Sequence, residues 1–204
     1  KTHQPERKQE KQEQPIEMFK TKDYYTDLFQ VSETQLERLV EEGLERGGNY
    51  CDLYFENTVF NNLFLRDGIV SSGGSHIDYG IGIRVLEGEK TGYAYSESTD
   101  AASMSDAARA AAAIAGGKKG SPLKVGCRLP SFPKDTCTWQ KDWMEESAGY
   151  YVPYMEKLRN MIFAREQKVS KVMLMLQWQN SDILMFNSDG EMTFDTRPLA
   201  SLNA

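Results

Sequence analysis

Residues 49–96 have the sequence NYCDLYFENTVFNNLFLRDGIVSSGGSHIDYGIGIRVLEGEKTGYAYS, and the pattern of this stretch decides the fold class. Apolar and polar side chains alternate from Cys51 to Glu56 and again from Asp78 to Leu86, which is the period of a strand with one buried face. The dipeptide Asp67-Gly68 tolerates the positive φ of a tight hairpin, and a polar turn at 87–90 leads into a further strand. The stretch therefore predicts consecutive antiparallel strands.

Helices are predicted on both sides of this stretch. Ser32 and Gln35 have the spacing of a capping box, and the apolar side chains that follow recur on one helical face as far as Arg46. A run of alanines predicts a second helix over 100–115, with Thr99 or Asp100 as its cap. A third helix is expected in the region that ends at Lys168.

The last third of the chain reads as a meander of strands. Apolar side chains alternate from Val172 to Trp178, a turn is expected near Asn180, and a strand over 183–187 follows. Ser188-Asp189-Gly190 then turns the chain into a strand over 192–197. Because helices and strands are grouped separately, the predicted class is α+β, with antiparallel sheet or sheets packed against a few helices.

The predicted domain organisation is a tail followed by one domain. Residues 1–17, KTHQPERKQEKQEQPIE, contain almost no apolar side chain and cannot bury enough surface to offset their ordering entropy. We therefore predict a disordered or extended tail over 1–29 and a single domain over 30–204.

Charge and hydropathy exclude two classes of partner. The net charge is −6, and no stripe of Lys and Arg is present that would neutralise phosphates, so we expect no nucleic-acid partner. No apolar run approaches the roughly 20 residues that span a bilayer, so we expect no membrane span. Cys51, Cys127 and Cys137 have no C-x-x-C spacing, which favours reduced thiols in a cytosol-like compartment. Export with a removed signal, and a Cys127–Cys137 bridge, remain open.

No catalytic residue and no metal ligand is predicted on this chain. His3 is followed by Gln4 and His76 by Ile77, so neither histidine begins an H-E-x-x-H or H-E-x-x-x-H helix. We place His76 in a loop with Gly73-Gly74-Ser75. A serine nucleophile would need a G-x-S-x-G elbow or a nearby His base, and no such elbow occurs.

One group of residues is a candidate for binding an extended peptide. Glycines inside strands often mark the close approach of another backbone, although bulges or close packing of the alanine-rich helix explain them more simply. Two tyrosines share a strand face, and with an arginine they could recognise a peptide carbonyl or carboxylate. The candidate residues are Gly80, Gly82, Arg84, Gly92, Tyr93 and Tyr95.

Several short runs resemble the TldD branch of the TldD/PmbA family. The most specific is Gly88 to Ser96, GEKTGYAYS, supported by the runs at 52–55, 66–70 and 78–85 and by Ser188-Asp189-Gly190 followed by DTRPL from Asp195. The resemblance covers roughly residues 30–204. It implies that the chain is the amino-terminal domain of a zinc metallopeptidase that acts on peptides or small unfolded proteins.

The resemblance carries further expectations. Members of this family hold zinc in a carboxy-terminal domain through an H-E-x-x-x-H motif and a later Cys, which the 204 residues lack, so zinc is expected only in the full-length protein and this chain alone is expected to be inactive. Its role would then be to shape substrate access and subunit assembly. A homodimer or a TldD/PmbA-type heterodimer and a cytoplasmic location are also implied. The alternative is a non-catalytic peptide- or partner-binding module of the gyrase-modulator type.

Overall fold

A computed structural model describes residues 20–117, 125–128 and 142–204 of the chain. It contains five strands in one sheet: β1 (Tyr50–Arg66), β2 (Ile69–Glu87), β3 (Lys90–Ser96), β4 (Met173–Asn187) and β5 (Met192–Asn203). The helices are α1 (Lys22–Phe29), α2 (Glu33–Leu44), α3 (Ala101–Ala115) and α4 (Ala148–Arg165), with a short 3-10 turn η1 (Trp143–Glu145) before α4. The predicted α+β class is confirmed.

The sheet is antiparallel throughout, in the order β3-β2-β1-β4-β5. The predicted hairpin between β1 and β2 is present, and Asp67 and Gly68 both have positive φ, of 54° and 81°. β1 has 17 residues and β2 has 19, far beyond the five or six that are usual. The sheet is therefore long in the strand direction.

Two predicted breaks in the strands are wrong. Gly73 and Gly74, placed in a loop with His76, lie inside β2, where they pair with Leu63 and Asn62 of β1. The turn expected near Asn180 is absent, because Asn180 pairs with β1 on one side and with β5 on the other. In both places pairing with the neighbouring strands outweighs the local preference of Gly and Asn for turns.

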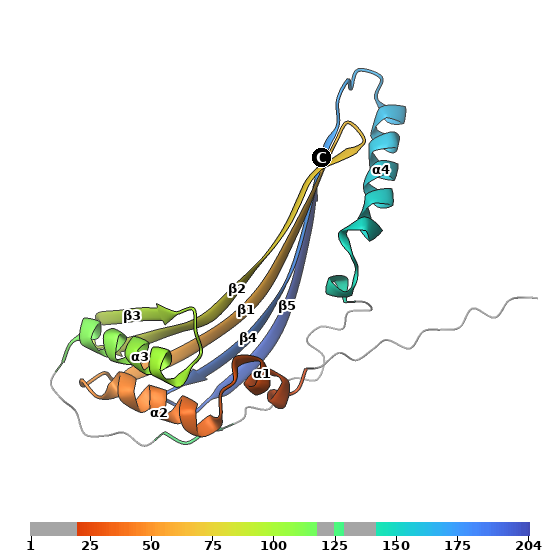
Figure 1. The fold of residues 1–204 in the computed structure, drawn as a ribbon. Helices are drawn as coiled ribbons and strands as arrows, with labels where there is room; N and C mark the ends of the chain where they lie inside the picture. The colour runs from red at the N-terminus through yellow and green to blue at the C-terminus, as the bar shows by residue number, and fades with distance from the viewer. Residues whose placement is uncertain (1–19, 118–124, 129–141) are drawn as a thin grey trace, which may run out of the picture.

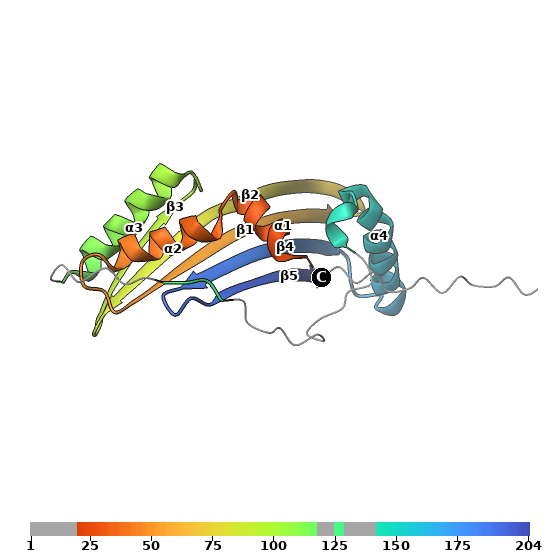
Figure 2. The same cartoon turned by 90° about the horizontal axis from the view of Figure 1, so that it is seen from below.

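All four helices lie on one face of the sheet, which bends so that they are on its convex side (Figure 1). Figure 2 shows α2 and α3 over one end, α1 nearer the middle and α4 over the other end. No helix of the described residues lies on the opposite, concave face. We call this face the uncovered face. Its side chains alternate along every strand with those that face the helices, and on β1 they include Asp52, Tyr54 and Glu56.

The helices create two separate hydrophobic cores on the covered face. The larger one joins α1, α2 and α3 to the sheet, and its fully buried members include Phe29, Leu36, Phe55 and Ile83. The smaller one joins α4 to the distal half of the sheet, and comprises Leu63, Leu65, Met155, Val172, Leu174 and Trp178. The strands between the cores connect them.

The helix boundaries agree with local sequence signals. Ser32 accepts a hydrogen bond from the Gln35 backbone N–H while the Gln35 side chain accepts from the Ser32 N–H, so the predicted capping box begins α2. Asp100 caps α3 through Ala102 N and Ser103 N. Hydrogen bonds from the Ser103 hydroxyl first, and then from the Ser103 N–H and the Ser98 hydroxyl, hold the pKa of the Asp100 carboxyl well below its usual value. The third predicted helix corresponds to α4, with Pro153 inside it.

The predicted tail is too long at its carboxyl end. Residues 22–29 form α1, and two of its side chains, Tyr25 and Phe29, are 2% and 0% exposed. The reason is compositional, because the polar pattern of 1–17 does not continue into this segment, which supplies aromatic side chains to the larger core. Residues 1–19 lie outside the described part of the chain.

Candidate functional site

The predicted peptide-binding residues divide between the two faces of the sheet. Arg84 pairs with Tyr93, and Gly82 pairs with Tyr95, across the β2–β3 ladder. Gly82 and Arg84 lie on the uncovered face because they alternate with the buried Ile81, Ile83 and Val85. Tyr93 and Tyr95 share this face because they stand opposite Arg84 and Gly82 in register. Gly80 shares this face by its position. Gly92 does not, because it is opposite Val85 and faces α3.

Gly92 and Gly80 have structural roles. A Cβ on Gly92 would lie 1.9 Å from the carbonyl oxygen of Ala111, so the glycine allows α3 to rest directly on β3. A Cβ on Gly80, whose φ is +154°, would lie 2.3 Å from the carbonyl oxygen of Ser96. Close packing of the alanine-rich helix thus accounts for Gly92, whereas the close neighbour of Gly80 is the backbone at the end of β3.

Tyr93 and Tyr95 form the most exposed aromatic pair on the uncovered face. Tyr93 is 57% exposed and Tyr95 is 71% exposed. Tyr93 lies across the neighbouring strand, because a Cβ on Gly82 would stand 2.6 Å from its hydroxyl oxygen and 3.1 Å from its ring. Gly82 therefore makes room for Tyr93, and both rings remain available to a partner at the end of the sheet.

Arg84 is already paired with a carboxylate. Its Nε lies 3.2 Å from both carboxylate oxygens of Asp52 on the adjacent strand, and its Nη2 also donates to Asp52. Hydrogen bonding to Asp52, and then its charge, raise the pKa of Arg84 above the ordinary value. Arg84 therefore presents a fixed ion pair beside the tyrosines, and a peptide carboxylate would have to compete with Asp52 for it.

A buried polar cluster on the same face has no counterpart in the sequence predictions. Thr58 and Ser181 are 5% and 7% exposed, and their hydroxyl oxygens are 2.7 Å apart. Thr58 also donates to Glu56, with 2.5 Å between the oxygens. The two hydroxyls are 123 residues apart in sequence, so no local pattern reveals them. They tie β1 to β4 in the middle of the uncovered face.

The remainder of this face mixes apolar and charged side chains. Met173 and Met185 on β4 are 59% and 37% exposed, and Leu199 on β5 is 62% exposed. His76 rests against Phe60, with ring centroids 4.7 Å apart. The face is thus a broad amphipathic surface.

No metal centre is evident in residues 20–117, 125–128 and 142–204, where no three His, Cys, Asp or Glu side chains could together hold an ion. Cys51 is buried, and burial raises its pKa to about 12, so its thiol is not a ready ligand or nucleophile. Cys127 is a free thiol that lies 3.8 Å from the sulfur of Met192. Its suggested partner Cys137 is outside the described residues.

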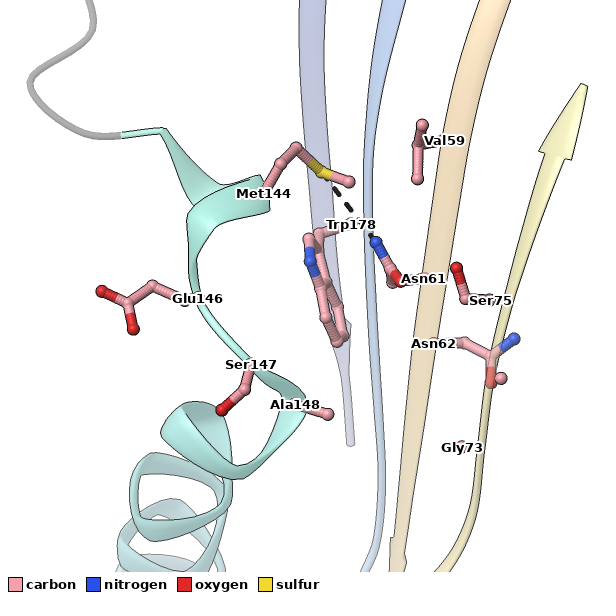
Figure 3. A pocket seen from close by; sticks show the side chains of 11 residues that line it. Val59, Asn61, Asn62, Gly73, Ser75, Met144, Glu146, Ser147, Ala148 and Trp178 are labelled. Carbon is pink, nitrogen blue, oxygen red and sulfur yellow. Dashed lines mark hydrogen bonds between the residues drawn. The ribbon is translucent and has the colours of Figure 1, made fainter. Parts of the chain in front are cut away.

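A second concave site lies on the covered face. A pocket of about 360 Å³ lies between the middle of the sheet and the beginning of α4, and its lining includes Asn61, Ser147 and Trp178 (Figure 3). Nothing in the sequence indicated it, because its walls come from β1, β2, β4 and the segment before α4, which are far apart along the chain.

Proteins of similar sequence carry metallopeptidase or metalloprotease names. Residues 51–115 match the family model described as PmbA/TldA metallopeptidase domain 1. The chain is 30% identical over 167 residues to the metalloprotease TldD homolog of Haemophilus influenzae, which covers 78% of this chain and 33% of that protein. It is 27% identical over 163 residues to the metalloprotease TldD homolog of Buchnera aphidicola subsp. Acyrthosiphon pisum, covering 78% and 32%.

Solved structures share the fold at low sequence identity. TldE from Thermococcus kodakarensis has a TM-score of 0.56 at 17% identity, over 82% of this chain and 38% of its own. A candidate modulator of a DNA gyrase from Thermotoga maritima has a TM-score of 0.61 at 16% identity, over 83% and 38%.

The chain spans about a third of the length of the curated relatives that it matches. None of the described helices is long and apolar enough to cross a membrane. The match of 51–115 to the first-domain model, together with the alignment of the TldD homologs over most of the sequence, places this chain in the PmbA/TldD metallopeptidase family as its amino-terminal domain.

Proposed function

We propose that this chain is the domain of a TldD-like zinc metallopeptidase that guides peptides or small unfolded proteins toward a metal held elsewhere in the full-length protein. The observation that carries the proposal is the uncovered face, a long concave sheet surface with exposed aromatic, methionine and leucine side chains. Peptide-binding surfaces characteristically combine apolar anchors with polar groups of this kind.

A free strand edge adjoins this face. β3 pairs with β2 only from Ile81 to Glu87, so residues 69–79 of β2 have a described partner, β1, on one side alone. Backbone N–H and C=O groups at such an edge can pair with an extended peptide by strand addition. Peptide substrates without stable structure of their own are the class that this mode of binding accepts.

Zinc does not fit the described residues, which offer no cluster of three ligands. We therefore infer that any zinc of the full-length protein is held outside this domain, and that the domain contributes binding and orientation. A cytoplasmic location, and assembly as a homodimer or as a heterodimer of the TldD/PmbA type, belong to the same proposal. Their support is the family, together with a solved structure of the same fold that is named TldE.

The 204-residue chain is expected to bind no stoichiometric zinc and to cleave no unfolded peptide, whereas a full-length version should do both. The measurement is zinc content by metal analysis, followed by cleavage of a casein-like unfolded substrate with and without a chelator. A full-length protein that neither binds zinc nor cleaves would overturn the proposal. Activity in the 204 residues alone would also overturn it.

In an active full-length protein, Tyr95→Ala is expected to raise the KM for an unfolded peptide about tenfold, because an exposed aromatic anchor is worth on the order of 1–2 kcal/mol. The matched control is Tyr154→Ala, which removes a comparably exposed ring (60%) from α4 on the other face. Equal effects of the two substitutions would show that the uncovered face does not bind substrate.

The second candidate function is a non-catalytic module that binds peptides or a partner subunit. The free edge of β2 and the exposed Met185 and Leu199 favour it as much as they favour a peptidase domain. Peptide affinity without any zinc-dependent cleavage in the full-length protein would select this alternative.

A further inference from the structure

Trp178 has a buried donor without an acceptor. The residue is 4% exposed, and its indole Nε1 makes no hydrogen bond with any of the described residues. The ring is held by Tyr151, with centroids 4.9 Å apart. An unsatisfied buried N–H costs about 1–3 kcal/mol, so native structures rarely contain one that has no partner in the working state.

This indole faces the pocket between the sheet and α4. Figure 3 shows the nitrogen-bearing edge of Trp178 turned toward the segment from Met144 to Ala148. The pocket volume is about 360 Å³, whereas one water occupies about 30 Å³ of liquid. Small-molecule sites begin near ~300 Å³, so the pocket has room for a compact organic ligand.

Further donors converge on the same space from other elements. α4, which has 18 residues, begins at the pocket, and its N-cap Ser147 makes no capping hydrogen bond through its side chain. The first-turn N–H groups of such a helix attract an oxygen with partial negative charge. Asn61 Nδ2 donates to the sulfur of Met144 at 3.9 Å, and sulfur is a weak acceptor that an oxygen can replace.

The charges around the pocket select a neutral ligand. No Lys or Arg is among its lining residues. The one charged lining residue is Glu146, and Figure 3 shows its carboxylate pointing away from Trp178 and the sheet. An anion would therefore be bound without a counter-ion, which is costly in a site of this kind. Val59, Met144 and Ala148 add apolar surface for the body of a ligand.

We propose that this pocket binds a small neutral molecule through an amide carbonyl oxygen, which accepts from the indole N–H of Trp178. The ligand class is a blocked amino acid or a comparable carboxamide. The site is on the covered face, opposite the uncovered face, and it shares Gly73 to Ser75 with the free edge of β2. The proposal does not depend on peptide binding at that edge.

The direct test is a titration of the ¹⁵N-labelled 204-residue chain with N-acetylleucine amide, followed through the tryptophan indole N–H resonances. The Trp178 resonance, assigned by its loss in Trp178→Phe, is expected to move downfield and to saturate. Sodium acetate, which carries a charged oxygen acceptor, is expected to leave it in place. No saturable shift with either probe would mean that the pocket holds water only, and tighter binding of acetate would also overturn the proposal.

A variant that fills the pocket tests the ligand site without changing Trp178. Gly73 lines the pocket, and a Cβ there would meet its nearest neighbours at 3.4 Å, so Gly73→Leu can fill the space without displacing β2. It is expected to weaken binding of N-acetylleucine amide at least tenfold by calorimetry. The matched control is Ser72→Leu, one residue away on the opposite face of the strand, which should bind as the unaltered chain does. Equal affinity of both variants would refute the site.

Discussion

Replacing Gly92 by alanine is expected to destabilise the domain by about 3 kcal/mol, at the upper end of what overpacking usually costs. The added Cβ would stand 1.9 Å from the carbonyl oxygen of Ala111 and 2.6 Å from the backbone nitrogen of Ala115. Both atoms belong to the helix backbone, which cannot rotate away as a side chain can. α3 must therefore lift from β3, and its buried face of small residues would lose contact with the sheet.

The measurement for Gly92→Ala is the free energy of unfolding in urea, followed by circular dichroism. The matched control is Gly74→Ala, because Gly74 is also a strand glycine, has no positive φ, and has no atom closer than 3.6 Å to the position of an added Cβ. The control is expected to be neutral or slightly stabilising, since alanine restricts the unfolded chain more than glycine does. If both variants unfold at the same urea concentration, α3 does not rest on Gly92.

Gly92, Gly73 and Gly74 also illustrate which parts of the fold can be predicted from the sequence. Local signals predicted local structure correctly, as at the capping box of Ser32 and Gln35 and at the hairpin of Asp67 and Gly68. The predicted loop at Gly73-Gly74 was wrong because a strand that pairs along its whole length can include glycines. This pairing depends on the register of the whole hairpin, which the local turn preference of two glycines does not reveal.

The candidate sites follow the same division. The face shared by Arg84, Tyr93 and Tyr95 could be predicted from the two-residue period of a strand, and the structure brings them together. The Asp52 partner of Arg84, and the pairing of Thr58 with Ser181, depend on register between strands. The acceptor-free indole of Trp178 depends on how α4 approaches the sheet. The alternation of side chains along one strand shows which residues share a face, but not which residues of other elements they contact.

Asp182 is another residue with partners that are distant in the sequence. Asp182→Ala is expected to lower the free energy of unfolding by about 3 kcal/mol, which is at the low end for breaking a buried ion pair. Asp182 is 4% exposed. Its carboxylate accepts hydrogen bonds from Lys20 at 2.7 Å, from Tyr24 at 2.9 Å and from Thr196 at 2.6 Å. Removing it leaves these donors unsatisfied and releases α1 from the sheet. Asp195→Ala is the control, because Asp195 forms an exposed ion pair with Arg197 that is worth less than about 1 kcal/mol.

The pH dependence of stability distinguishes the contribution of the Lys20–Asp182 ion pair from that of apolar packing. Burial lowers the pKa of Lys20, but its hydrogen bonds to Asp182 and Tyr24 and the charge of Asp182 outweigh that effect, so the net pKa lies above the ordinary 10.5. A raised pKa in the folded state means that the contribution is complete below pH 10.5 and is lost as the pH rises through the folded value. The unaltered chain should therefore lose stability above that pH, whereas Lys20→Met should lose less over the same range. If the two curves run parallel, the charge of Lys20 does not hold α1 on the sheet, and the cost of Asp182→Ala comes from its hydrogen bonds to Tyr24 and Thr196.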